Sequence, residues 1–478
     1  MSTRWVAPIA VLITAVVLAA PAAAYGEADT APVFNKGGNT ARSAPDVPQD
    51  GVPNVVVLVS DDQAEGTLDV MPNVRALRDA GVAMTTGIIP TSLCCPSRSA
   101  LLSGKLAHTT GVYKNLGSHG GWPTFFGSGA EADTFAVALD NAGYRTGLFG
   151  KYLNGYALAD DTYVPPGWDE FRAIYDPDGK PALAAGAYYN YILHGTGVDE
   201  AHGDAPRDYS TDVLTDQAVD FINATPNDQP FLLFYSTTGP HAPFIPAPRH
   251  EGLWHTEKLP PSVLTLTKRR AAFWPDRTVD YDKMQNRLQA HHEALMSVDE
   301  GVGRIVDAVG GRAPDTLFVY LSDNGLQFGE HGLRLLKGVP FGASTEVPMF
   351  LRWDGHIPAG SKDDQPFRNI DLTTTILDAT NTTVSNPEGV GYFQPDRPTG
   401  VVLEAAKSPE HPAYCGWRTS RYLFVEYDGV ARRELFDYVK DPYELVNRAT
   451  KGSYANRLAE FRQQAISACD PTPPGFDW

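Results

Sequence analysis

Unbroken apolar runs alternate along this chain with segments in which apolar residues recur every three or four positions. Strands that are buried on both faces read as unbroken apolar runs, whereas helices with one buried face show the 3.6-residue period. The alternation therefore predicts an α/β fold with a mainly parallel central sheet and helices on both of its faces. The predicted strands span residues 54–59, 82–89, 144–149, 230–235 and 316–321, and the predicted helices span residues 71–80, 134–141, 210–222 and 284–309.

Two long segments lack a clear period. Residues 157–208 are rich in Tyr, Gly, Pro and Asp, and we expect irregular insertions there, around the rim of a site where substrate-selecting residues often lie. Residues 243–282 are predicted to form a long loop. After a Gly/Pro-rich linker at residues 386–400, alternating runs and a helical segment at residues 454–468 predict a small α+β unit.

The N-terminus has the pattern of a secretory signal peptide. Arg4 precedes an apolar stretch at residues 6–19, and a run of three alanines follows. We therefore predict a signal peptide at residues 1–24, cut after Ala24, and a disordered lead-in at residues 25–50. The apolar stretch is too short to favour an anchor, and we find no other membrane segment. The mature protein is predicted to be secreted, with no membrane span.

The composition bounds the class of ligand. With 42% hydrophobic and 20% charged residues in 478, the chain can bury a large core and a second, smaller unit. Its formal net charge of −18 argues against nonspecific binding to nucleic acid. The charge does not exclude an anionic substrate, because a local basic pocket can outweigh a distant surface field.

The four cysteines fall into two pairs. Cys415 and Cys469 lie in the last quarter of the chain, and disulfides persist in exported proteins. We predict that these two pair, with two buried thiols as the alternative. Cys94 and Cys95 are then left over, which fits another fate for Cys94.

Residues 91–105 contain signals for the start and the end of a helix, together with residues that can carry or bind charge. Pro96 suits the first position of a helix, and Gly104 suits its end. A cysteine at such an N-terminus lies near unpaired backbone N–H groups and the positive end of the helix dipole. Cys94 is therefore placed to carry or contact negative charge, and Arg98 adds a guanidinium one turn further along.

Polar residues follow several of the predicted strands. Because the carboxyl ends of parallel strands share one edge of a sheet, we expect these residues to converge there. Three carboxylates and an amide oxygen, without a Cys/His ligand pattern, suit Ca²⁺ or Mg²⁺ rather than zinc. For Asp61-Asp62 alone, the alternative is a helix cap or a turn, and for Asp323-Asn324 alone it is a turn. The residues are Asp61, Asp62, Lys151, His241, Asp323 and Asn324.

The string Cys94-x-Pro96-Ser97-Arg98-x-x-x-Leu102-Ser103-Gly104 resembles the signature of type I sulfatases. The resemblance implies an alkaline-phosphatase-like fold, with a catalytic domain at residues 51–385 and a C-terminal subdomain at residues 386–478. Residues 367–380 resemble the helix that closes the catalytic domain. The resemblance further implies that Cys94 is oxidised to Cα-formylglycine by a formylglycine-generating enzyme. It favours Ca²⁺ as the cation, with Mg²⁺ left open, and the implied ligands are Asp61, Asp62, Asp323, Asn324 and the modified Cys94.

The resemblance also implies a mechanism. A hydroxyl of hydrated formylglycine attacks the sulfur of a sulfate ester while His241 protonates the departing alcohol. The second hydroxyl then allows sulfate to be expelled and the aldehyde to be restored. Lys151, Lys337 and Arg98 are implied to stabilise the charge on the transferring group. Without the resemblance, Lys151 and Lys337 would be interpreted as solvated surface lysines, and His241 as a structural residue of its loop.

One position departs from the pattern of many arylsulfatases, which have a histidine two residues after the lysine that matches Lys151. Here Leu153 stands in that place, and Asn154 or His119 is a candidate to replace the histidine. The run of residues 150–154 looks more like the N-acetylglucosamine-6-sulfatase and heparan-sulfatase branch. This resemblance favours a sulfated sugar over an aryl sulfate as the substrate.

Two other functions fit the same residues. A phosphoester or phosphonate-ester hydrolase of the same superfamily could use the same cations, and a catalytically inactive secreted protein could bind glycans. The remaining histidines are expected to have lesser roles. We predict that His291 and His292 face solvent and that His108 does not contact the substrate directly. For His331, contact with the substrate is the most that we expect.

Overall fold

The computed structural model describes residues 51–156, 163–175, 186–197, 199–255, 258–264, 279–334 and 336–478. The predicted signal peptide at residues 1–24 and the lead-in at residues 25–50 lie outside these ranges. Within the described ranges, no helix combines the length and the apolar character needed to cross a membrane.

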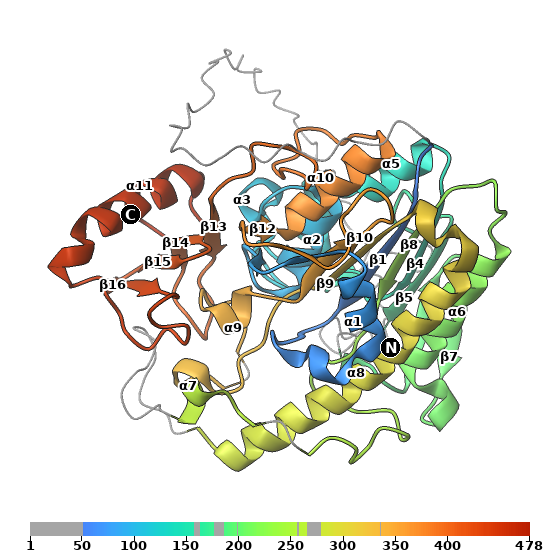
Figure 1. The fold of residues 1–478 in the computed structure, drawn as a ribbon, viewed down its shortest axis with the longest axis horizontal. Coiled ribbons are helices and arrows are strands. Elements are labelled where there is room, and N and C mark those ends of the chain that lie inside the picture. The colour runs from blue at the N-terminus through green and yellow to red at the C-terminus, as the bar shows by residue number, and fades with distance from the viewer. Residues whose placement is uncertain are drawn as a thin grey trace, which may run out of the picture. The chain divides into compact units, whose positions relative to one another are not determined.

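A ten-stranded mixed sheet forms the centre of the fold, in the order β11-β2-β10-β9-β1-β8-β4-β5-β6-β7 (Figure 1). The five neighbours from β9 to β5 run parallel, as the apolar runs predicted, and antiparallel pairs occur towards both edges. The strands are β1 (Asn54–Ser60), β2 (Val82–Met84), β4 (Arg145–Gly150), β5 (Glu170–Tyr175), β6 (Tyr191–Gly195), β7 (Glu200–His202), β8 (Phe231–Ser236), β9 (Thr316–Ser322), β10 (Met349–Arg352) and β11 (Ser361–Asp363).

Helices cover both faces of this sheet, as predicted (Figure 1). Successive side chains of β1 point to opposite faces, so Val56 packs with one group of helices and Val55 and Val57 pack with the other. The first group is α1 (Pro72–Asp79), α6 (Ser210–Ala224) and α8 (Tyr281–Val309), and the second is α2 (Cys94–Ser103), α5 (Phe135–Asn141) and α10 (Asn369–Thr380). The shorter helices are α3 (Ala107–Thr110), α4 (Gly121–Gly127), α7 (Pro261–Leu264) and α9 (Gly342–Thr345).

Two predicted elements have different boundaries in the structure. The strand expected at residues 82–89 is divided: β2 joins the main sheet, whereas β3 (Gly87–Ile88) pairs with β12 (Phe367–Arg368) in a separate two-stranded sheet. The helix expected at residues 367–380 therefore begins only at Asn369. An apolar run does not reveal that the chain changes partners halfway along it.

Residues 157–208, where we expect insertions around the rim of a site, contain regular strands in their described parts. This segment supplies β5, β6 and β7, which extend the main sheet at one edge. Strands of three to six residues are too short to show a clear two-residue period. The long loop expected at residues 243–282 contains α7, and residues 256–257 and 265–278 within it lie outside the described ranges.

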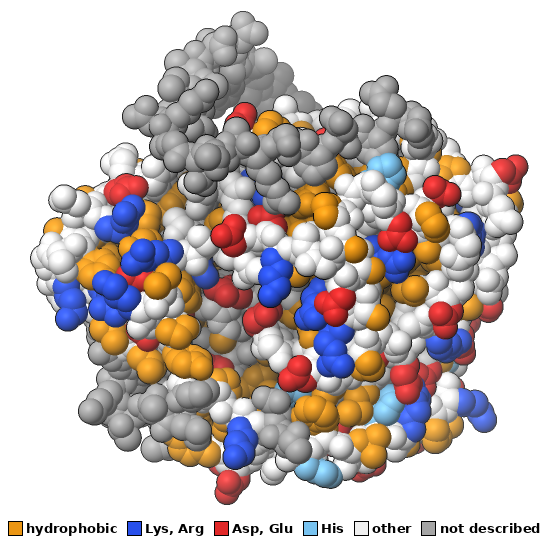
Figure 2. Space-filling view, in the orientation of Figure 1, with side chains coloured by type: hydrophobic (Ala, Val, Ile, Leu, Met, Phe, Trp, Pro, Cys, Tyr) orange, Lys and Arg blue, Asp and Glu red, His pale blue; other side chains and the backbone are white. Residues whose placement is uncertain are grey.

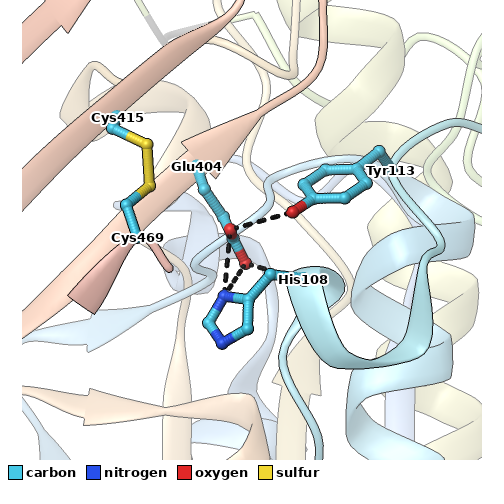
Figure 3. The surroundings of a disulfide bond; sticks show 5 residues. All are labelled: His108, Tyr113, Glu404, Cys415 and Cys469. Atoms are coloured by element: carbon cyan, nitrogen blue, oxygen red, sulfur yellow. Dashed lines mark hydrogen bonds and ion pairs between the residues drawn. A yellow bond between two sulfur atoms is a disulfide. The ribbon is translucent and has the colours of Figure 1, made fainter. Parts of the chain in front are cut away.

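A four-stranded antiparallel sheet with one packed helix forms the C-terminal unit, as the alternating runs predicted (Figure 1). Phe424 and Leu435 of the sheet pack against Phe461 and Ala465 of the helix. A disulfide joins Cys415 to Cys469, which confirms the predicted pairing (Figure 3). The elements are β13 (Gly400–Ala405), β14 (Tyr414–Thr419), β15 (Tyr422–Tyr427), β16 (Val430–Asp437) and α11 (Ala455–Ala468).

His108 of α3 contacts Glu404 of the C-terminal sheet near this disulfide (Figure 3), and a second glutamate, Glu388, also lies near its ring. Its Nδ1 lies 3.1 Å from Glu404 Oε2, and its Nε2 lies 3.5 Å from Glu388 Oε1. Tyr113 OH donates to the same Glu404 carboxylate at 3.2 Å. Burial alone would lower the pKa of His108, but Glu388 and Glu404 raise it to about 10. His108 thus links α3 to the C-terminal sheet and to the segment that contains Glu388.

This histidine predicts a pH dependence of stability. Above pH 6.5 the unfolded chain loses the His108 proton, whereas the folded protein retains it until about pH 10. The contribution of the His108 charge to the free energy of unfolding is complete below pH 6.5. It declines as pH rises, by at most about 2 kcal/mol between pH 7 and 8.5. Urea unfolding of wild type and His108→Gln across this range should show a steeper decline for wild type. Equal slopes would contradict the role of the His108 charge.

Candidate active site

The edge formed by the carboxyl ends of β1, β4, β8 and β9 gathers the predicted polar residues. Ser60 pairs with Ser322, so the residues that follow these two strands, Asp61-Asp62 and Asp323-Asn324, lie side by side. Gly150 pairs with Ser236, which brings Lys151 to the same edge. The sequence-predicted convergence is therefore present in the structure.

Cys94 is the first residue of α2 and is completely buried. Its Sγ lies 2.9 Å from Lys337 Nζ and 3.9 Å from Asp61 Oδ1. The helix begins two residues earlier than predicted, so Pro96 occupies its third position, and Gly104 ends it with a φ of 71°. This earlier start places Cys94 itself, rather than the residue after it, among the unpaired N–H groups of the helix terminus.

Arg98 lies one turn further along α2 and is also buried. Its Nε donates to Asp323 Oδ2 at 2.7 Å, and its Nη1 donates to the Lys151 carbonyl at 2.9 Å and to Ser236 Oγ at 2.5 Å. One guanidinium thereby fixes the ends of β9, β4 and β8 relative to α2. Sequence reasoning missed Ser236, although it is the last residue of a predicted strand region and precedes His241 by only five positions.

Two lysines each contact one aspartate of the pair that follows β1. Lys151 Nζ pairs with Asp61 and lies 3.7 Å from Asp323 Oδ2, while Lys337 Nζ pairs with Asp62. Burial would raise the pKa of Asp62, but Lys337 and His241 lower it below its ordinary value. Burial and the neighbouring Asp323 raise the pKa of Asp61, which the adjacent cations oppose only in part. Asp61, Asp62 and Asp323 are all buried at this edge, next to the two lysines.

The oxygen atoms at this edge fit a divalent cation. Asp61, Asp62, Cys94 and His241 each offer an atom within 4.8 Å of the others. Asn324 Nδ2 donates to Asp62 Oδ1 at 2.7 Å, whereas its buried Oδ1 has no hydrogen-bond partner among the described residues. A buried acceptor without a donor is costly unless a cation satisfies it, and carboxylate and amide oxygens are ligands of Ca²⁺ and Mg²⁺.

His241 lies in the loop after β8, between two cis prolines. Its Nδ1 donates to the Ala242 carbonyl at 2.6 Å, which leaves Nε2 facing Asp62 Oδ2 at 3.5 Å. Tyr188 OH donates to the His241 carbonyl at 2.7 Å and so holds the loop in place. Burial would lower the pKa of His241, but Asp62 and Asp61 raise it. The imidazole is partly exposed, unlike the carboxylates below it.

The prediction that His291 and His292 face solvent is wrong, because both are buried on α8. His291 Nε2 donates to the carbonyl of Asp62 at 3.0 Å and supports the backbone of that residue, whose φ is 65°. Burial lowers the pKa of His291 to about 3, so its ring is neutral. The helical spacing of apolar residues in α8 did not reveal that this helix is covered on more than one side.

The other candidate residues are placed as follows. Leu153 is buried in the apolar core, and His119 is exposed. Asn154 is buried, and its Oδ1 has no hydrogen-bond partner among the described residues. His331 is buried and bonds to Glu444 at 2.9 Å, at the contact with the loop after β16.

The central sheet, its two helical layers and the antiparallel C-terminal sheet define an alkaline-phosphatase-like fold. A sequence profile described as Sulfatase matches residues 53–382, and the chain belongs to the sulfatase family. It is 31% identical over 435 residues to the putative extracellular sulfatase Sulf-1 homologue of Caenorhabditis elegans, covering 85% of this chain and 56% of that relative. It is 30% identical over 402 residues to the N-acetylglucosamine-6-sulfatase of Capra hircus, covering 80% and 67%. The chain thus spans little more than half of the length of the nematode relative.

Solved structures share the fold. One, described as a complex with its substrate D-glucosamine-2-N,6-O-disulfate, has a TM-score of 0.74 at 21% identity, over 90% of this chain and all of that one. The phosphonate monoester hydrolase of Agrobacterium radiobacter has a TM-score of 0.68 at 18% identity, over 88% and 96%. The fold is therefore shared by proteins named for two different ester classes, and the fold alone does not choose between them.

Proposed function

We propose that this protein is an exported sulfatase that hydrolyses a sulfate ester of a sugar, with a catalytic domain at residues 51–385 and a C-terminal subdomain at residues 386–478. The observation that carries the proposal is the position of Cys94. Its Sγ lies at a helix N-terminus, 2.9 Å from one lysine and 3.9 Å from an aspartate of a cation-binding edge. An oxygen nucleophile in the place of this sulfur would lie beside two features that favour negative charge, the helix N-terminus and the Lys337 ammonium group.

The proposed substrate is a sulfated sugar, with 6-O-sulfated glucosamine as the first compound to test. The goat relative is named for N-acetylglucosamine-6-sulfate hydrolysis, and the structural neighbour is described with a 6-O-sulfated glucosamine as its substrate. Membership of the sulfatase family favours a sulfate ester over the phosphoester and phosphonate alternatives.

Cα-formylglycine at position 94 would supply an oxygen nucleophile that is restored after each turnover. Cys94 is fully buried in the folded chain, so the formylglycine-generating enzyme must reach it before folding. Lys337, whose Nζ lies 2.9 Å from the side chain of residue 94, and Lys151, which pairs with Asp61, are proposed to bind the oxygens of the transferring sulfate. Arg98 holds Asp323 and the Lys151 carbonyl, so its contribution is to position these groups and to balance their charge.

A Ca²⁺ ion held by Asp61, Asp62, Asp323, Asn324 and residue 94 would supply positive charge where the sulfate oxygens bind. Adding Ca²⁺ to chelator-treated protein should raise the unfolding temperature, with a stabilisation of about 3 kcal/mol at a hundredfold excess over the dissociation constant. Asn324→Ala should weaken this response, because it removes the unpartnered amide oxygen. A larger response to Mg²⁺ would contradict the choice of Ca²⁺, and no response to either ion would contradict the site.

His241 is proposed to protonate the leaving alcohol. Its Nδ1 proton is committed to the Ala242 carbonyl, so Nε2 is the atom that can donate a proton towards the substrate. The partial exposure of the ring fits a position between the buried carboxylates and an incoming ester. Proton donation of this kind matters most when the leaving group is a poor one, such as a sugar alkoxide.

His241→Asn should therefore lower kcat for a sugar sulfate by roughly a hundredfold. The same variant should retain most of its activity towards 4-nitrophenyl sulfate, whose leaving phenolate needs little protonation. Steady-state rates on the two esters give the comparison. An equal loss on both substrates would show that His241 orients or binds sulfate and does not act as the acid.

The function itself is tested by two measurements on natively produced protein. Mass spectrometry of the peptide that contains Cys94 should show the aldehyde, and rates on aryl sulfate should exceed those on matched aryl phosphate. A preference for phosphate or phosphonate would favour the other hydrolase class. An unmodified thiol together with no hydrolysis, but with retained glycan binding, would favour the inactive glycan-binding alternative.

A further inference from the structure

The C-terminal unit carries a cationic cavity that none of the active-site residues lines. The cavity has a volume of about 370 Å³, and three cations and one acid are among its lining residues, which are Arg421, Lys440, Arg457, Glu460, Tyr422, Tyr454, Ser453 and Asn456. In Figure 2, Lys and Arg side chains gather with hydrophobic ones at the left, over α11 and the sheet that it covers. Such a local concentration of positive charge contrasts with the net charge of −18 of the chain.

Aromatic rings hold these cations in place. The guanidinium carbons of Arg421 and Arg457 lie 4.9 Å and 5.3 Å from the centroid of the Tyr422 ring. Lys440 Nζ lies 5.5 Å from the centroid of the Tyr454 ring. Cation–π contacts restrict long side chains without neutralising them, so the cations are partly ordered before a ligand arrives.

The cations are only partly committed to acidic partners. Arg457 pairs with Glu460 at 3.1 Å, but both side chains are about half exposed, and exposed pairs of this kind contribute little. Lys440 Nζ contacts Tyr454 OH at 3.1 Å and has no ion pair with a carboxylate among those of the described residues. Arg421 is held more firmly, because it pairs with the buried Asp437. Lys440 and Arg457 are thus the two cations best able to contact an external anion.

We propose that this cavity binds a sulfate group of a long sulfated glycan, at a site separate from the catalytic edge. Sulfate oxygens accept hydrogen bonds from ammonium and guanidinium groups, and the tyrosine rings offer flat apolar surface to the adjoining sugar. The choice of a sulfated glycan rests on the proposed function, since the substrate would then be part of the same polymer. Binding at the C-terminal unit would raise the local concentration of ester near the active site.

The test measures binding of a heparin octasaccharide to Cys94→Ala protein by calorimetry, so that hydrolysis does not enter the result. The double variant Lys440→Glu/Arg457→Glu should bind at least about tenfold more weakly, because two charged hydrogen-bond donors are lost. In the protein with Cys94 intact, the same double variant should leave kcat/KM for 4-nitrophenyl sulfate unchanged.

Arg304→Glu/Lys362→Glu is the matched control, since it makes the same change of net charge at exposed positions outside the cavity. An equal loss of affinity in both double variants would reduce the effect to net charge and overturn the proposal. Unchanged affinity in the cavity variant would overturn it as well. So would binding to vesicles that contain phosphatidylserine without binding to the octasaccharide. Failure of the proposed function would appear separately, as absent sulfate hydrolysis by the unmutated protein.

Discussion

Replacing Cys94 by alanine should lower kcat/KM for a sulfate ester by roughly 10⁴-fold or more, because the nucleophile is lost while its surroundings remain. The neighbouring Lys337 and Asp61 stay in place, so weak binding of the ester should persist. Steady-state kinetics on an aryl sulfate, together with calorimetric binding of the uncleaved ester, separate these two effects.

Cys95→Ala provides the matched control for this prediction. Cys95 lies on the same helix and is equally buried, and burial raises the pKa of its thiol to about 12. Such a thiol stays protonated and inert, and its side chain packs in the apolar core. Cys95→Ala should therefore lose some stability and keep its activity. If the two variants lost activity equally, the role assigned to position 94 would be wrong.

Removing the disulfide should cost about 4 kcal/mol of unfolding free energy for a closed loop of 54 residues. The bond joins β14 to the residue after α11. Without it, the chain segments that form this helix and the C-terminal sheet are no longer tied together in the unfolded ensemble. Cys415→Ala/Cys469→Ala should lower the denaturation midpoint in urea, measured by circular dichroism.

Reduction of the wild-type protein gives an independent check on this effect. It should shift the midpoint as far as the double substitution does, because both remove the same constraint and differ only in small packing changes. A shift below about 1 kcal/mol would show that packing of Phe461 and Ala465 holds the helix without the bond.

Much of the fold could be predicted because its central strands are unbroken apolar runs. Val55 to Val59 is buried on both faces of the sheet, and such burial leaves no polar position in the sequence. The polar residues directly after those runs could be assigned to one edge, since parallel strands end together. The sequence therefore predicts that Asp61, Asp323 and Lys151 meet, and the structure brings them together.

The features that the sequence did not reveal depend on contacts between segments that are distant in the chain. Residues 82–89 read as one strand, yet Phe367 captures the second half in a separate sheet. His291 was expected in solvent because local spacing does not show how many neighbours a helix has, and α8 is covered where it supports Asp62. Ser236 carries no motif of its own and became notable only through its bond to Arg98.

The sequence alone predicted the cysteine motif, the candidate oxygen ligands and the sheet edge where they converge, because polar residues directly follow apolar runs that form parallel strands. Folding in three dimensions decided which lysine contacts which aspartate, left Asn324 Oδ1 without a hydrogen-bond partner among the described residues, and formed the cationic cavity beside α11. Those features are set by side chains brought within a few ångströms from positions far apart in the chain, and one-dimensional patterns contain no such distances.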